Sequence, residues 1–291
     1  MSDEELSDRL RDLDHRLTRL GPTIVAFSGG ADSAFLVAAA ARALGPDQVL
    51  AVTSTSASLA SGEWAAARPF ATSLGVEHLA VVTDEMTRAS YRANGPDRCY
   101  HCKSALGDLL LDLARQRGVP SIAYGTNADD LAEFHRPGLR AARERRVATP
   151  LADAGLTKQD VRTASRAWGL PTWDKPQAAC LASRVAYGVE VDPERLARVD
   201  RAEAAVRSEL ARWGIPAVNL RVRDLGDRAR IEVDREHVAA VRERSSAVAV
   251  VVAAGFRTAE VDDRGFRSGA MNEVLGSGDL ARSSWDLPLV D

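Results

Sequence analysis

Three cysteines in two separate segments are the side chains of this chain best suited to chemistry. Cys99 and Cys102 form a CxxC pair in the sequence RCYHCK, and Cys180 stands in KPQAACLASR. Two thiols at this spacing can bind one metal ion or form a redox pair. An odd number of cysteines argues against a disulfide scaffold. We therefore expect reactive thiols or metal ligands, and two half-buried small residues are the plain alternative for the CxxC pair.

Positively charged neighbours bear on how these thiols would react. Lys103 directly follows Cys102, and its ammonium group would help to keep a thiolate charged. Arg184 shares an irregular segment with Cys180, where it can contact an anion. Cysteines in loops beside an arginine are better placed for reactivity than cysteines in a core. We therefore expect Cys180 to be reactive.

A glycine-rich loop is the second candidate site. The sequence SGGADS supplies Ser28, Gly29, Gly30, Asp32 and Ser33. Glycines let backbone N–H groups approach a phosphate, and the start of a helix adds its positive end. The serines offer hydroxyl groups, whereas the Asp32 carboxylate has the wrong sign for phosphate and should cap the helix or hold Mg²⁺. The loop lacks the lysine of a Walker A motif, so it is not built to activate a γ-phosphate.

The sequence GTNADD is a third signal, and it follows a predicted strand. It contains Gly125, Thr126 and Asp129, which are candidates for binding ATP. Its acids can bind Mg²⁺ or a substrate, and an Asx-type helix cap is the structural alternative. Thr53, at the end of another predicted strand, is a further candidate for ATP binding.

Short apolar runs alternate with helical patterns through the first part of the chain. Helices are predicted at 6–20, 34–44, 64–74 and 106–117, and strands at 23–27, 49–53, 77–82 and 121–124. This alternation predicts an α/β fold with a doubly wound parallel sheet, which binds ligands at the carboxyl ends of its strands. The following stretch, 136–187, is more irregular and has one convincing helix, at 158–168.

The pattern changes after this irregular stretch. Asp192-Pro193 forms an N-cap with proline at the first helical position, and the helix runs to about Trp213. Two strands follow, at 220–225 and 230–233, and then a charged helix and a last strand at 258–261. We interpret this order as a small α+β domain of ferredoxin-like type.

Three segments follow from these patterns. We expect an ATP-binding domain at 1–188, a smaller domain for substrate binding or oligomerisation at 189–272, and a flexible tail at 273–291.

The composition excludes several classes of protein. The 291 residues are 45% hydrophobic and 27% charged, with a formal net charge of −3 and a pI near 6.0. This balance predicts no strong attraction to nucleic acid or to an anionic membrane. The charged N-terminus is not a signal peptide, and no apolar run is long enough to span a bilayer. We expect a cytoplasmic enzyme, in which the arginine-rich run 136–146 is a solvated helix face or a phosphate contact.

The glycine-rich loop resembles that of the PP-loop ATP pyrophosphatases. Members of that superfamily have an adenine nucleotide alpha-hydrolase-like fold, cleave ATP between its α- and β-phosphates and transfer AMP to a substrate. The alternative is an ordinary glycine-rich turn between strand and helix.

The joint order of motifs is more specific. From about residue 23 to residue 272 the chain contains SGGADS, RCYHCK, GTNADD, RPG, KPxxxCLxSR, RVR, ARIEV and FRSGAMNE. This order resembles the ATP-dependent sacrificial sulfur transferases of nickel-pincer nucleotide synthesis (the LarE family). The resemblance implies an enzyme that adenylates a carboxylate of a pyridinium biscarboxylate mononucleotide and converts it to a thiocarboxylate.

The resemblance also implies roles for the candidate residues. The Ser28–Ser33 loop would hold the ATP pyrophosphate, and Cys180 matches the sulfur-donating cysteine. In one branch of the family this cysteine gives up its own sulfur and becomes dehydroalanine. In another branch three cysteines bind a [4Fe–4S] cluster that carries an extra sulfide. Because Cys99, Cys102 and Cys180 are all present, the chain resembles the cluster branch, while a sacrificial Cys180 and a Cys₃His zinc site are the alternatives.

Substrate binding is expected from arginines of the smaller domain. Arg221 and Arg223 share one face of a predicted strand, and the family's equivalents lie near the substrate phosphate, a group that arginine binds well. A solvated strand face is the alternative. Arg184 and Glu203 are weaker candidates: Arg184 can contact an anion, and a surface position is the alternative for Glu203.

The family resemblance further implies a homo-oligomer. Two other functions compete with the proposed one: a tRNA thiolase, which should carry a basic face, and a nucleotide- or metal-binding regulator without catalysis.

Overall fold

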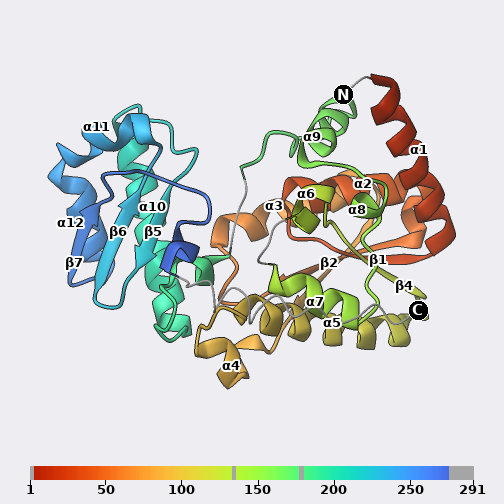
Figure 1. The fold of residues 1–291 in the computed structure, drawn as a ribbon, viewed down its shortest axis with the longest axis horizontal. Coiled ribbons are helices and arrows are strands. Elements are labelled where there is room, and N and C mark those ends of the chain that lie inside the picture. The colour runs from red at the N-terminus through yellow and green to blue at the C-terminus, as the bar shows by residue number, and fades with distance from the viewer. Residues whose placement is uncertain (1–2, 133–135, 177–179, 275–291) are drawn as a thin grey trace.

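The computed structural model describes residues 3–132, 136–176 and 180–274, and Figure 1 shows them arranged in two lobes. The tail expected at 273–291 falls, from residue 275 onward, outside the described residues. No helix of the described residues has both the length and the apolar character needed to cross a membrane.

A sheet of four parallel strands forms the centre of the larger lobe, with the strand order β3-β2-β1-β4. The strands are β1 (Thr23–Ala26), β2 (Val49–Thr55), β3 (Glu77–Val82) and β4 (Ser121–Tyr124). The register aligns Ala26 of β1 with Val52 of β2 and with Tyr124 of β4. The carboxyl ends of these three strands therefore lie together at one edge, as expected for the α/β fold that the sequence predicted.

Helices cover both faces of this sheet (Figure 1). They are α1 (Asp3–Leu20), α2 (Ala31–Leu44), α3 (Ser61–Ser73), α4 (Ala89–Arg92), α5 (Arg98–Arg117), α6 (Ala128–Ala132), α7 (Pro137–Glu144), α8 (Pro150–Asp153) and α9 (Lys158–Ala167). Val25 of β1 packs into a core with Phe35 of α2, whereas its neighbour Ile24 packs into a second core with Leu110 of α5. Alternate residues of a strand face opposite sides, so a buried parallel strand is apolar on both.

The start of α5 and the presence of α7 differ from the expectation. α5 begins at Arg98 rather than at residue 106, so the CxxC pair lies in its first turn and does not precede it. The apolar period that marks a helix starts only with Leu106, because cysteines and polar residues occupy the first turns. α7 forms in the stretch expected to be irregular, beginning with a proline at its first position.

The smaller lobe contains a three-stranded sheet in the order β5-β6-β7. Its elements are α10 (Pro193–Arg212), β5 (Arg221–Asp224), β6 (Arg228–Glu232), α11 (Val238–Arg242), α12 (Ser245–Ala253) and β7 (Thr258–Val261). Asp192 caps α10 by accepting a hydrogen bond from the Arg195 backbone N–H at 2.7 Å, as the sequence predicted. The predicted order of strands is confirmed, but two short helices, α11 and α12, stand where the sequence predicted one charged helix.

The ferredoxin-like type is wrong. β5 and β6 are antiparallel, but β6 and β7 are parallel, and Val185 forms an isolated parallel bridge with Asp224 of β5. Two parallel crossovers joined by one hairpin therefore build this lobe, whereas the split arrangement of a ferredoxin-like sheet makes its neighbouring strands antiparallel.

Short 3-10 segments complete the described chain. They are η1 (Pro46–Gln48), η2 (Glu85–Thr87), η3 (Leu181–Arg184), η4 (Arg235–His237) and η5 (Ala270–Val274). The core of the smaller lobe includes Leu181 of η3, Val185 and Tyr91 of α4 together with Leu196 of α10. Residues before position 189 thus contribute to this core, and the boundary at 188/189 stays a prediction.

Leu196→Ala should lower the free energy of unfolding by about 2–5 kcal/mol, because truncating a fully buried leucine removes apolar contacts and leaves a cavity. Urea unfolding measures the change. Val252→Ala in α12, where the valine is 40% exposed, is the control and should change stability by about 0.5 kcal/mol or less. Equal losses in the two variants would contradict this assignment of the core.

Candidate active site

The loop between β1 and α2 is held by its own hydroxyl groups. The Ser33 Oγ accepts a hydrogen bond from the Ser28 backbone N–H at 3.2 Å and donates one to the Gly30 carbonyl at 3.1 Å. The Ser28 and Ser33 hydroxyls lie 3.1 Å apart. Gly29 has a φ of 76°, a conformation that favours glycine. The loop is thereby bent onto the first turn of α2, whose unpaired N–H groups can bind an anion.

Asp32 lies within this first turn and does not cap it. The residue preceding α2, Gly30, forms no side-chain cap, and the Asp32 Oδ2 instead forms an ion pair with Nζ of Lys158. The Asp32 Oδ1 is buried without a full hydrogen bond. Burial raises the pKa of this carboxyl group, and Lys158 opposes that rise. The expected cap is therefore wrong, whereas a Mg²⁺ ligand is consistent with a buried oxygen that has coordination capacity left.

Two lysines that sequence reasoning missed lie at this loop. Lys158 is the first residue of α9, 126 positions after Asp32. Lys175 donates a hydrogen bond from Nζ to the Gly29 carbonyl at 2.9 Å, across 146 positions. No spacing rule connects residues so far apart. Lys175 begins the KPxxxCLxSR motif, but nothing in that motif pointed to the phosphate loop. Both lysines place an ammonium group at a loop whose own sequence, SGGADS, contains no lysine.

GTNADD packs directly against the loop. A Cβ atom on Gly125 would lie 2.8 Å from the Ser33 backbone N and 2.9 Å from its Cα, which only glycine avoids. The Thr126 carbonyl accepts the Ala152 N–H at 3.1 Å. The Asp129 Oδ2 accepts the Lys158 backbone N–H at 2.8 Å, so Asp129 orients the lysine that contacts Asp32.

The next residues of this segment form the Asx-type cap that the sequence analysis named. The backbone N–H of Asp130 donates to the Asn127 side chain at 3.1 Å, and the N–H of Asn127 donates to the Asp130 side chain at the same distance. The cap and the contact with the loop coexist.

Thr53 is buried, and its hydroxyl is used by the protein itself. Oγ1 donates to the Phe27 carbonyl at 2.7 Å and lies 2.8 Å from Nε2 of His78. Burial, with a smaller contribution from Arg68, lowers the pKa of His78, so the ring is neutral near pH 7. Thr53 thus ties β2 to the start of the phosphate loop.

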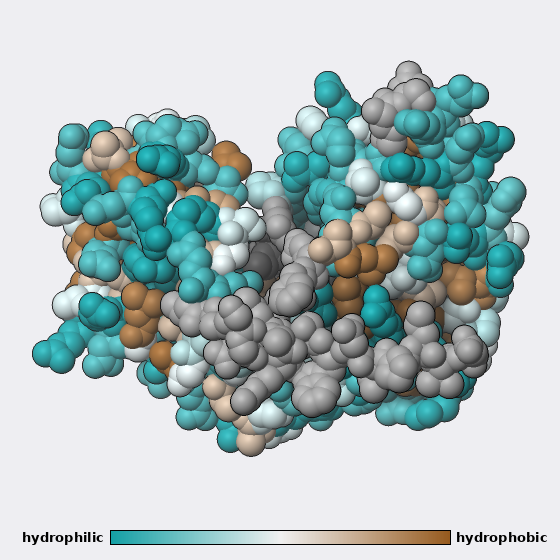
Figure 2. Space-filling model, viewed as in Figure 1, coloured by the Kyte–Doolittle hydropathy of each residue, from teal (hydrophilic) through white to brown (hydrophobic). Residues whose placement is uncertain are grey.

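The two cysteine segments are anchored at the same edge of the sheet. Lys103 lies with Nζ 5.0 Å from the ring centroid of Tyr124, which ends β4 and precedes Gly125. The Leu181 N–H, next to Cys180, donates at 2.8 Å to the carbonyl of Ser58, shortly after β2. Figure 2 shows the surface hollowed between the two lobes.

Cys99 and Cys180 are exposed, whereas Cys102 is partly buried and packs against the core of the smaller lobe. Burial raises the pKa of the Cys102 thiol to about 12, the negative charge of a Cys180 thiolate adds to the rise, and Lys103 opposes it too weakly to keep a thiolate. The thiols therefore influence one another. Among the described residues, however, no group of three Cys, His, Asp or Glu side chains is arranged to hold a metal ion.

The surface position that was the alternative for Glu203 is excluded, because the residue is buried. Glu203 is 7% exposed and accepts two hydrogen bonds from Arg184, at 2.9 and 3.3 Å, and one from the Val222 backbone N–H at 3.1 Å. Arg184 also donates to the Cys180 carbonyl at 3.0 Å. Arg184 and Glu203 form a buried pair that holds the Cys180 segment on the smaller lobe.

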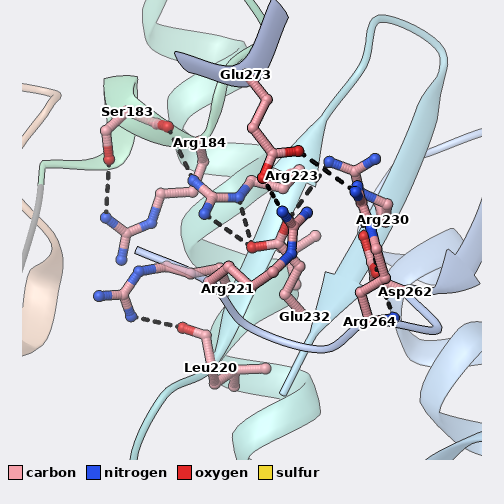
Figure 3. Close-up of polar contacts among 12 residues, drawn as sticks. Ser183, Arg184, Leu220, Arg221, Arg223, Arg230, Glu232, Asp262, Arg264 and Glu273 are labelled. Carbon is pink, nitrogen blue, oxygen red and sulfur yellow. Dashed lines mark hydrogen bonds and ion pairs between the residues drawn. The ribbon is translucent and has the colours of Figure 1, made fainter. Parts of the chain in front are cut away.

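Arg221 and Arg223 are buried, so the solvated strand face is excluded. Arg223 donates to Glu232 at 2.8 Å and to the Ser183 carbonyl at 3.1 Å (Figure 3). Arg221 donates to the Leu220 carbonyl at 2.7 Å. Burial lowers the pKa of Arg221 to about 10, and the positive charges of Arg184 and Arg223 add to this effect. The region thus concentrates positive charge around Arg221.

The arginine-rich run 136–146 is paired with protein groups. Arg136 lies 2.7 Å from Asp130, Arg145 lies 2.7 Å from Asp108, and Arg140 stacks 4.0 Å from the ring centroid of Tyr100. These pairs favour the helix-face interpretation.

Comparisons with known proteins agree with this geometry. The family model described as NAD synthase matches residues 6–131, the part that contains the phosphate loop. A protein of Synechocystis sp. (strain ATCC 27184 / PCC 6803 / Kazusa) with an uncharacterised function is 39% identical over 273 residues, which cover 93% of this chain and 99% of that protein.

A second relative carries an informative name. The pyridinium-3,5-bisthiocarboxylic acid mononucleotide synthase of Lactiplantibacillus plantarum is 33% identical over 258 residues, which cover 88% of this chain and 91% of that protein. This chain belongs to the family of that synthase. Residues 6–131 of this chain form a PP-loop domain of the NAD synthase type, as the loop sequence predicted.

Gly125→Ala should weaken ATP binding by at least about tenfold, because the new methyl group must displace the backbone of the phosphate loop. Equilibrium dialysis with ATP and Mg²⁺ measures the dissociation constant. Gly118→Ala is the control: it has a φ of 65° but open space at Cβ, so it should lower stability by about 1 kcal/mol and leave ATP binding unchanged. Unchanged binding in Gly125→Ala would separate GTNADD from the nucleotide site.

Proposed function

We propose that this chain is an ATP-dependent sulfur transferase that adenylates a carboxylate of a pyridinium biscarboxylate mononucleotide and converts it to a thiocarboxylate, in nickel-pincer nucleotide synthesis. The observation that carries the proposal is the anchoring of both thiol segments at the sheet edge that bears the phosphate loop. Membership in the synthase family supports the substrate class. The proposal also includes a cytoplasmic location, a homo-oligomeric state and a boundary between the two domains at residue 188.

Adenylation follows from the charges at the loop. N–H groups of the loop and the first turn of α2, with Lys158 and Lys175, would bind the β- and γ-phosphates of ATP. A substrate carboxylate oxygen attacks the α-phosphorus, the bond from that phosphorus to the bridging oxygen breaks, and pyrophosphate leaves with its electron pair. Asp32, with Asp129 close to Lys158, would hold Mg²⁺, which neutralises charge on the leaving group when bound.

Arg221 is the best candidate to bind the phosphate of the substrate. Arg221 is buried beside Arg184 and Arg223, whose positive charges lower the pKa of its guanidinium, while Glu203 opposes that effect. A phosphate dianion in this region would relieve that repulsion.

We further propose that Cys99, Cys102 and Cys180 hold a [4Fe–4S] cluster. Three thiolates suit such a cluster and leave one iron without a protein ligand, where an extra sulfide for transfer can bind. The proximity of the thiols supports this proposal, but the described side chains are not in ligand geometry. Cluster binding therefore requires Cys102 to turn out of its apolar packing.

Pyrophosphate release tests the enzyme proposal. Wild-type protein with ATP, Mg²⁺ and the pyridinium substrate should release pyrophosphate, and Cys180→Ala should retain this release while losing thiocarboxylate formation by at least about a hundredfold. Mass spectrometry of the product measures the second step. Unfractionated tRNA in place of the pyridinium substrate is the control. Release with tRNA alone, or full thiolation by Cys180→Ala, would contradict the proposal.

Protein purified without oxygen tests the cluster. We expect a broad visible absorption band with about four iron and at least four sulfide per chain. Cys99→Ser should remove the band, and the exposed Ser73→Ala in α3 is a control that should retain it. A colourless, iron-free protein that forms one thiocarboxylate per chain and acquires dehydroalanine at position 180 would instead establish a sacrificial cysteine.

A further inference from the structure

The two cysteine segments are joined by a buried polar network. Asn94, between α4 and α5, is fully buried and has a φ of 55°, which is strained for a residue other than glycine. Its Nδ2 lies within hydrogen-bond distance of the carbonyls of Val185, Ala186 and Val189, at 3.3, 2.8 and 2.9 Å. The Asn94 carbonyl accepts the Gly188 N–H at 3.2 Å. The segment after Cys180 is thereby fixed to the segment before Cys99.

Arg98 completes this network from the first turn of α5. Its Nη1 donates to Oδ1 of Asn94 and, at 2.8 Å, to the carbonyl of Ala182. Arg98 directly precedes Cys99, and Ala182 lies two positions after Cys180, so this one nitrogen connects the two cysteine segments. Loss of these bonds would free the Cys180 segment from the CxxC helix.

The charge of Arg98 is the unusual part of the network. Arg98 is 5% exposed, and it forms no ion pair with a carboxylate among the residues that the structure describes. A cation buried without an anion costs several kcal/mol, so a site of this kind implies an anionic partner.

The groups around Arg98 indicate which anion this is. Arg98 directly precedes Cys99, its Nη1 bonds to the carbonyl of Ala182 two positions after Cys180, and its guanidinium carbon lies 5.9 Å from the ring centroid of Tyr187. The cysteine segments and the Tyr187 ring therefore flank the charge, where a carboxylate is expected. The anion that fits this position is sulfur: a thiolate, a persulfide or the sulfide of a cluster.

We propose that Arg98 is the positioning residue of the sulfur centre: it clamps the Cys180 segment to the CxxC helix and neutralises the anionic sulfur that the centre delivers. The proposal rests on the proposed function and adds a residue that acts through the cysteines. The hydrogen bonds of Arg98 go to Asn94 and Ala182 and not to the phosphate loop, so adenylation should not depend on it. Its loss should therefore separate the two half-reactions.

The first test uses the reduced, metal-free full chain and needs no turnover. A short bismaleimide should cross-link Cys99 to Cys180, which are both exposed, and peptide mass spectrometry measures the yield. Arg98→Met should lower the initial cross-linking rate about tenfold or more. Arg98→Lys retains the charge but cannot bridge Asn94 and Ala182 in the same way. Its cross-linking rate should lie between those of wild type and Arg98→Met. Arg115→Met, at the exposed end of the same helix, is the matched control.

The second test separates positioning from general structural damage. In Arg98→Lys, pyrophosphate release should stay within about twofold of wild type, while thiocarboxylate formation falls about tenfold to a hundredfold. Arg115→Met should leave both unchanged. Far-UV circular dichroism and thermal unfolding establish that each variant is folded.

Two results would overturn the proposal. One is a folded Arg98→Lys and Arg98→Met pair whose cross-linking and thiolation equal those of Arg115→Met. The other is a parallel loss of pyrophosphate release and thiolation, which would make Arg98 a general structural residue. Failure of the proposed function is distinguishable, because wild-type protein would then release no pyrophosphate while the cross-linking comparison still measures the clamp.

Discussion

Parallel pairing of β1 with β2 and β4 is the constraint on which the rest of the structure depends. It brings three strand ends to one edge, so that the phosphate loop, the residues after β2 and GTNADD meet although they are distant in sequence. The close approach of Gly125 to the backbone of Ser33 shows how tightly the edge is packed. Because neighbouring loops support one another here, the anion-binding geometry is a property of the sheet and not of the loop alone.

The sequence predicts what depends on local pattern. Alternating apolar runs gave the parallel sheet, and Asp192-Pro193 gave the start of α10, because period and capping chemistry act within a few residues. The extent of α5 was missed because its first turns carry cysteines in place of an apolar stripe. The topology of the smaller sheet was missed because strand order depends on how helices pack across it, which no local pattern records.

The site divides in the same way. The glycines and serines of the loop can be predicted from their type and spacing, but Lys158 and Lys175 come to the loop only through the fold. Glutamate is a residue type usually found at the surface, and Glu203 is buried here because Arg184 pairs with it. Pairing of this kind is decided by tertiary contacts, and a buried ion pair fixes geometry more than it stabilises the protein.

Charge distribution orders the chemistry along this edge. The net charge of −3 says little about this distribution, because the proposed binding sites for ATP phosphates, substrate phosphate and sulfur each contain a buried or half-buried cation. Lysines lie at the phosphate loop, Arg221 lies in the smaller lobe, and Arg98 lies between the cysteine segments. In the proposed reaction the acyl-adenylate would be reactive toward water, so a sulfur nucleophile would have to reach it before solvent does. Fixing the cysteines to the sheet edge by buried hydrogen bonds serves that requirement, since it removes the entropy cost of bringing the sulfur to the activated carboxyl group.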